Sequence, residues 1–96
     1  WIGFPESDRE VEIVRSRLPE VGGALANQVV GAVNRLRAMD LEKLPGVAET
    51  IDWTESVSAL GSNSLTAEIA LDTLGAVVKD RDDLEYASRN IQDVIS

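Results

Sequence analysis

The chain has 96 residues, a formal net charge of −8, and hydrophobic and charged fractions of 44% and 27%. This length and composition predict one folded domain with a single modest core, and they argue against disorder. The sequence contains neither cysteine nor histidine, which excludes disulfides, cysteine nucleophiles and Ser–His catalysis within it and argues against a zinc site.

The first predicted element is a short extended segment at residues 1–5, with the sequence WIGFP. Its apolar residues favour β-structure, and Pro5 ends it. A capping box follows, with Ser7 as the predicted N-cap and Glu10 three residues later. We therefore expect a first helix that runs to about Leu18, where a proline follows.

Two further helices are predicted at residues 24–39 and 47–60 by apolar residues at helical spacing. Gly61 stands after the second of them, at the position of a left-handed C-cap. Either Ser64 or Thr66 can then cap a fourth helix.

The fourth helix is expected to run to about Lys79, and Asp80 can cap a fifth helix that continues to the end of the chain. No apolar run approaches the roughly 18 residues of a membrane span, and no signal peptide is visible. The sequence therefore predicts an all-α fold, a small bundle of four or five helices over residues 6–96, after the extended remnant at residues 1–5.

The negative charge is concentrated in the second half of the chain. Residues 1–45 carry six Lys/Arg and seven Asp/Glu, a net charge of −1, whereas residues 46–96 carry three and ten, a net charge of −7. Because this half would repel a polyanion, we expect no nucleic-acid partner. Two interpretations stay open, a solvated surface that aids solubility and a docking face for a basic partner.

One candidate modification site lies in the stretch LGSNSLTAEIAL, residues 60–71. It resembles the LG-x-DSL sequence of acyl and peptidyl carrier proteins, which are also small, acidic and helical. That resemblance implies phosphopantetheine on Ser64, although Asn63 stands where the family has an aspartate. The alternative interpretation is an ordinary loop serine beside the start of a helix.

A second resemblance covers nearly the whole chain. The segments GFPESDREVEIVRSRLP, PGVAETIDW and LGAVVKDRDDLE follow one another in that order. Together they resemble the C-terminal helical lid of MoxR-type AAA+ ATPases, most closely the CoxD-like branch associated with maturation of carbon monoxide dehydrogenase. The chain itself has no GxxxxGK[ST] phosphate loop, so we do not expect it to hydrolyse ATP alone.

The resemblance implies an N-terminal α/β core that binds ATP and Mg²⁺, with residues 1–5 as the last strand of that core. It also implies a cytoplasmic ring, expected to be a hexamer, that performs chaperone-like remodelling or metal-enzyme maturation. A protein of the von Willebrand factor A type is the implied partner. A free-standing acidic helical adaptor remains the alternative to an ATPase lid.

The family's phosphate-sensing arginine belongs to a G-x-S-P-R sequence at the start of a lid helix. Here Gly46 matches the glycine, Glu49 takes the place of the proline, and Thr50 falls at the arginine position. An acidic first turn stabilises a helix but weakens phosphate binding there. The missing positive charge could come from Lys43 or Arg37.

The resemblance also assigns the adenine contact to the middle of the first helix. The matching region is Ile13, Val14 and Arg17. Because apolar residues at this spacing also form cores, Ile13 and Val14 have core packing as their alternative role.

Overall fold

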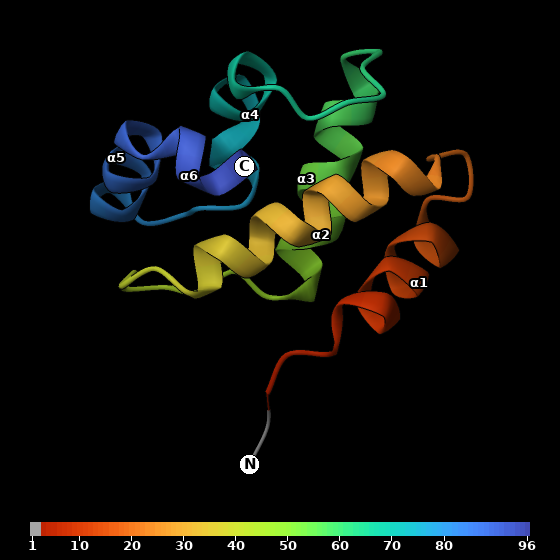
Figure 1. Ribbon diagram of the computed structural model, residues 1–96, viewed down its shortest axis with the longest axis horizontal. Helices are drawn as coiled ribbons and strands as arrows, with labels where there is room; N and C mark the ends of the chain where they lie inside the picture. The colour runs from red at the N-terminus through yellow and green to blue at the C-terminus, as the bar shows by residue number, and fades with distance from the viewer. Residues whose placement is uncertain (1–2) are drawn as a thin grey trace.

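The computed structural model describes residues 3–96, and every regular element within that range is helical (Figure 1). The elements in chain order are α1 (Ser7–Arg17), α2 (Gly23–Arg37), α3 (Val47–Ala59), α4 (Ala67–Thr73), the 3-10 helix η1 (Leu74–Ala76), α5 (Arg81–Arg89) and α6 (Ile91–Ile95). The predicted all-α bundle is confirmed for this part of the chain, with the last predicted helix divided in two.

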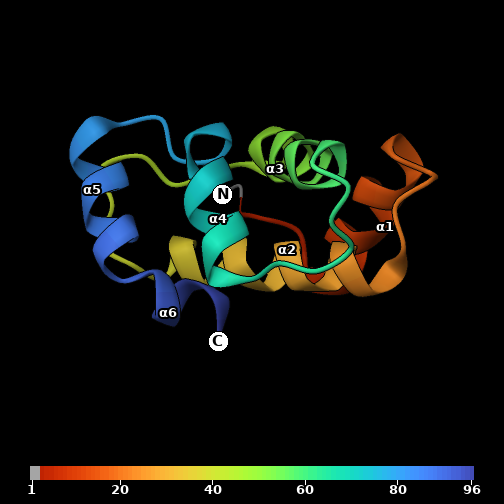
Figure 2. The same cartoon turned by 90° about the horizontal axis from the view of Figure 1, so that it is seen from above.

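Helix α2 is the central element of the bundle. It contacts α1, α3 and α6, and α3 in turn contacts α4 and η1. Figure 2 shows α1 and α5 at opposite ends of the molecule, with α2 running between them. The largest fully buried apolar side chains include Trp53, Leu36 and Leu74, and burying each such side chain contributes about 1.5–3 kcal/mol.

Three predicted helix ends are confirmed. Gly61 has a positive φ of 77°, the left-handed conformation expected after α3. The Thr66 hydroxyl accepts a hydrogen bond from the Ile69 amide at 3.2 Å, and the Asp80 carboxylate accepts one from the Asp83 amide at 3.1 Å. These side chains therefore begin α4 and α5 by satisfying first-turn N–H groups.

The fourth predicted helix is shorter than expected. It ends at Thr73, changes to 3-10 geometry, and does not reach Lys79. A glycine at position 75 and the β-branched pair Val77 and Val78 all have low helix propensity, and both valines are buried in the core. Their burial holds residues 77–79 outside any helix.

The fifth predicted helix is interrupted at Asn90, between α5 and α6. The Asn90 side-chain amide donates to the Tyr86 carbonyl at 2.8 Å, and the Asn90 backbone amide bonds the Tyr86 and Ala87 carbonyls at 3.2 and 3.1 Å. Asn90 itself has a non-helical backbone, with φ −113° and ψ 30°, so α5 ends there. The break lets α6 turn and pack against α2.

The predicted capping box at the start of α1 is wrong. The N-cap is Glu6, and it makes no side-chain capping bond. The Ser7 hydroxyl instead accepts from the Asn34 amide at 2.7 Å, and the Glu10 side chain points into the bundle. Residues 3–6 form neither helix nor strand. The predicted extended segment at residues 1–5 also includes Trp1 and Ile2, which lie outside the described residues.

Candidate functional site

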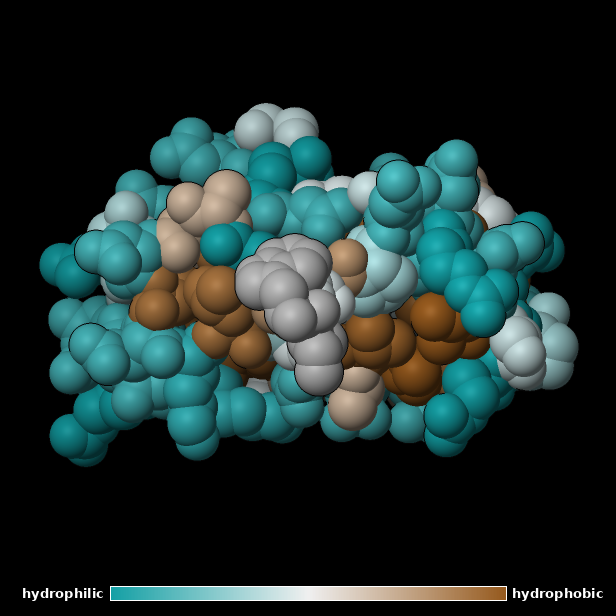
Figure 3. Space-filling view, turned by 90° about the horizontal axis from the view of Figure 1, so that it is seen from below, coloured by the Kyte–Doolittle hydropathy of each residue, from teal (hydrophilic) through white to brown (hydrophobic). Residues whose placement is uncertain are grey.

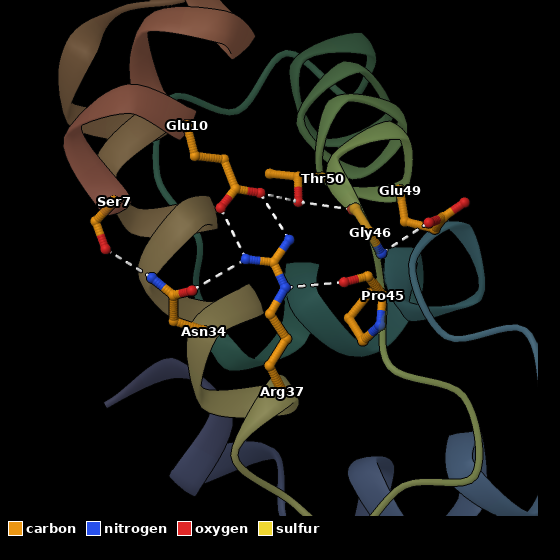
Figure 4. Close-up of polar contacts among 8 residues, drawn as sticks. All are labelled: Ser7, Glu10, Asn34, Arg37, Pro45, Gly46, Glu49 and Thr50. Atoms are coloured by element: carbon orange, nitrogen blue, oxygen red, sulfur yellow. Dashed lines mark hydrogen bonds and ion pairs between the residues drawn. The ribbon is translucent and has the colours of Figure 1, made fainter. Parts of the chain in front are cut away.

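A buried ion pair ties α1 to α2. The Arg37 Nη1 and Nη2 atoms each donate to one Glu10 carboxylate oxygen at 2.8 Å (Figure 4). The Glu10 side chain is 0% exposed and that of Arg37 is 6% exposed. Parallel bonds between guanidinium and carboxylate are among the strongest in proteins, so this pair fixes the angle between the two helices.

Arg37 uses its remaining donors to hold the segment before α3. Its Nε atom donates to the Pro45 carbonyl at 2.8 Å, and Nη1 donates to Asn34 Oδ1 at 3.1 Å. The Phe4 ring covers the guanidinium, with its centroid 3.9 Å from Cζ. Arg37 is therefore fully engaged inside the protein. The hypothesis that it supplies a free charge for a phosphate is wrong.

The start of α3 shows why its first turn is acidic. Glu49 Oε1 accepts the Gly46 amide at 2.8 Å, which confirms that this acid stabilises the helix start (Figure 4). A Cβ atom on Gly46 would lie 3.2 Å from the same oxygen, so glycine gives the carboxylate room to fold back. A phosphate at this amide would have to displace Glu49.

Thr50 lies in the core and not at the surface. Its side chain is 0% exposed, and its hydroxyl donates to Glu10 Oε2 at 2.7 Å. Thr50 completes the Glu10–Arg37 junction from α3. Position 50, where the family has its phosphate-sensing arginine, is therefore enclosed by α1 and α2 and gives Thr50 no contact with a nucleotide in this arrangement.

The three residues predicted to contact adenine separate onto two sides of α1. Val14 is fully buried in the core, so the prediction that it contacts a ligand is wrong. Ile13 and Arg17 face outward and line a shallow groove of about 280 Å³ together with Arg9, Glu12 and Ser16. This groove combines an apolar side chain with exposed guanidinium groups, which can stack on a flat ring or contact a phosphate.

Figure 3 shows two areas of hydrophobic surface on the face seen from below, one on the side of α1 and the other on the side of the loop between α2 and α3. Phe4 and Leu44 remain 46% and 44% exposed. Isolated exposed apolar residues are ordinary, but a gathered group of them is typical of a surface that contacts another domain or protein.

Ser64 lies in the loop before α4 and not in the helix. The helix begins at Ala67, three residues later, and Thr66 is its N-cap. The Ser64 backbone is engaged by Ser62, whose hydroxyl donates to the Ser64 carbonyl at 2.7 Å. The family pattern places the modified serine where a helix opens, so this geometry favours an ordinary loop serine.

No direct sequence signal indicates the Glu10–Arg37–Thr50 junction. Glu10 fitted a capping box, and that local pattern concealed its long-range partner. A charged residue in line with the apolar positions of α1 is the only available clue, since Glu10 lies four residues before the buried Val14. The pairing of Glu10 with Arg37 can be predicted only when the packing of α1 against α2 is known.

No family model, curated protein or solved structure matches the chain. The resemblance to MoxR-type lids therefore depends on the ordered sequence segments alone. Within residues 3–96, no helix is both long enough and apolar enough to cross a bilayer.

Proposed function

We propose that this chain is the helical lid of a MoxR-like AAA+ ATPase of the CoxD-like branch. In this proposal the lid packs on a nucleotide-binding core that precedes it, and ATP with Mg²⁺ binds between the two. The assembled protein is a cytoplasmic ring, with six subunits as the expected number. It remodels a partner enzyme or helps to mature its metal centre, together with a protein of the von Willebrand factor A type.

The observation that carries the proposal is the groove on α1. Ile13 and Arg17, two of the residues that the resemblance assigns to the adenine contact, both line it. An apolar side chain beside a guanidinium is suited to a purine ring and its attached phosphates. The two areas of hydrophobic surface seen in Figure 3 also support close contact with another domain.

The start of α3 has a mechanical role in this proposal. Thr50 and Arg37 are both bound to Glu10, so α1, α2 and α3 are joined at one point. A lid built in this way moves as one body when hydrolysis changes its contact with the core. Nucleotide contact through α1 would then move the whole bundle, without a sensing arginine on α3.

The test begins with the native polypeptide. An antibody raised against this chain should detect a protein several times heavier than 10.4 kDa in the source cells, and that protein should hydrolyse ATP after purification. In the full-length protein, Arg17→Ala should raise the KM for ATP by about tenfold, because it removes a charge-assisted contact. Arg15→Ala is the matched control, since Arg15 is exposed on the same helix but does not line the groove.

Two results would overturn the proposal. One is a native band at the mass of this chain, and the other is an unchanged KM in the Arg17→Ala variant. In the first case the free-standing acidic adaptor becomes the better hypothesis, supported by the net charge of −7 on residues 46–96. Incubation with a phosphopantetheinyl transferase, followed by mass measurement, tests the carrier alternative at Ser64.

A further inference from the structure

Both lysines of the chain lie at a single pocket. The sequence contains only Lys43 and Lys79, which are separated by 36 residues. The pocket has a volume of about 350 Å³ and is lined by Lys43, Leu44, Pro45, Glu49, Val77 and Lys79. We call it the lysine pocket. Its volume falls in the range of about 300–1,000 Å³ that is typical of small-molecule sites.

The two segments that carry the lysines are held together by Asp83. This residue is 4% exposed, and its two carboxylate oxygens accept the amides of Glu42 at 2.8 Å and Lys43 at 2.9 Å. Lys79 directly precedes Asp80, which caps the helix that contains Asp83. The backbones on both sides of the pocket are therefore fixed to the first turn of α5, and the pocket is formed before any ligand arrives.

Neither lysine has an ion-pair partner in the part of the chain that the structure describes. Among residues 3–96 the ion pairs are Arg9–Glu12 and Arg37–Glu10, and neither includes a lysine. Glu49 lines the same pocket, but its carboxylate bonds the Gly46 amide and lies beyond ion-pair distance of both ammonium groups. The chain has 17 acidic residues and a net charge of −8, so two unpaired lysines at one pocket make this part of the surface more positive than the chain is on average.

We propose that the lysine pocket binds the phosphate group of a small molecule. A phosphate monoester carries a charge of about −1.5 to −2 near neutral pH, which two ammonium groups can balance and one cannot. Lysine binds phosphate as a point charge, without the planar geometry that carboxylate recognition favours. The exposed apolar side chain of Leu44 provides contact for the body of the ligand, above a floor that includes the buried Pro45 and Val77.

This proposal does not depend on the ATPase lid. Nucleotides and other small phosphate compounds share the phosphate group that the pocket is proposed to bind, and the titrations below distinguish between them. Glu49 sets the strength of binding, because its negative charge opposes an anion in the same pocket. Its carboxylate cannot be lost without affecting the start of α3, unless the replacement retains an oxygen for the Gly46 amide.

The 96-residue chain can be tested directly by nuclear magnetic resonance. Isotope-labelled lysine gives one side-chain signal for each of the two lysines, so the probe reports on this pocket alone. Titrations with inorganic pyrophosphate, ATP and acetate are run at constant ionic strength. We expect both signals to shift and saturate with pyrophosphate and with ATP, and to respond weakly to acetate. Tighter binding of ATP identifies a nucleotide ligand, whereas equal binding identifies the phosphate alone.

Replacing a lysine and replacing Glu49 should change the affinity for pyrophosphate in opposite directions. Lys43→Ala and Lys79→Ala should each weaken pyrophosphate binding by about fivefold, as expected for one exposed charge contact. Glu49→Gln should strengthen binding, because it removes the opposing charge and keeps the acceptor for the Gly46 amide. Arg89→Ala is the control, since Arg89 is exposed on α5 and does not line the pocket.

The proposal is overturned if pyrophosphate shifts the lysine signals no more than acetate does. It is also overturned if Arg89→Ala weakens binding as much as the two lysine variants, because binding would then follow net charge alone. Lys43 and Lys79 are exposed, so their replacement by alanine should leave the fold intact, which circular dichroism can verify.

Discussion

The Glu10–Arg37 pair gives the sharpest test of how this fold is held together. In Glu10→Gln, an amide replaces the carboxylate that accepts Arg37 Nη1 and Nη2 at 2.8 Å and the Thr50 hydroxyl at 2.7 Å. The amide has one oxygen to accept these donors, and its NH₂ group would face the guanidinium. Arg37 is then left as a buried charge without a counter-charge.

Breaking a buried ion pair in this way costs about 3–5 kcal/mol. A domain of this size has a total stability of about 5–15 kcal/mol, so the variant should lose a large part of it. At about 4–8 °C per kcal/mol, the Tm should fall by more than about 12 °C. Thermal and urea unfolding, followed by far-ultraviolet circular dichroism, measure both quantities.

Glu12→Gln is the matched control on the same helix. Glu12 pairs with Arg9 at 3.5 Å, but the two side chains are 71% and 69% exposed. An exposed pair of this kind contributes less than about 1 kcal/mol. If Glu10→Gln destabilised the protein no more than Glu12→Gln does, the argument that the buried pair joins α1, α2 and α3 would be refuted.

Three further predictions concern single positions. Thr50→Arg should destabilise the bundle by more than about 3 kcal/mol in urea unfolding, because it places a second cation beside Arg37 at a fully buried site. Asp83→Asn should cost about 1–3 kcal/mol, since the amide accepts only one of the Glu42 and Lys43 amides well, and a Tm unchanged by this substitution would contradict that role. Gly61→Ala should destabilise by about 1 kcal/mol in thermal unfolding, because only glycine adopts its φ of 77° without strain.

Helix positions could be predicted because the apolar spacing and the cap residues act locally. Thr66, Asp80 and Gly61 each specify a helix end through contacts within a few residues, and all three have the predicted role. The last two helices were less predictable. The break at Asn90 is a change of backbone conformation at one residue, within a sequence whose apolar spacing is otherwise helical.

The candidate site was less predictable than the fold because its residues act over long distances. Glu10 and Thr50 are 40 residues apart and share a hydrogen bond in the core. The sequence shows that a residue is polar, but it does not show whether the side chain faces solvent or a buried partner. Val14 shows the same limit for apolar residues, since helical spacing indicates a face of α1 but does not say what covers it.

Arg35 and Arg37 have a different role from the two lysines, and side-chain chemistry explains the difference. Arg35 Nε donates to the Val94 carbonyl at 2.6 Å and joins α2 to α6, while Arg37 joins α2 to α1 and to the start of α3. A guanidinium suits these positions because its planar group of donors can satisfy several fixed acceptors at once. An ammonium on a flexible stem is better suited to a ligand that comes and goes. The two lysines have no ion-pair partner among residues 3–96, and both lie at one pocket, so their flexible ammonium groups stay available to a ligand there.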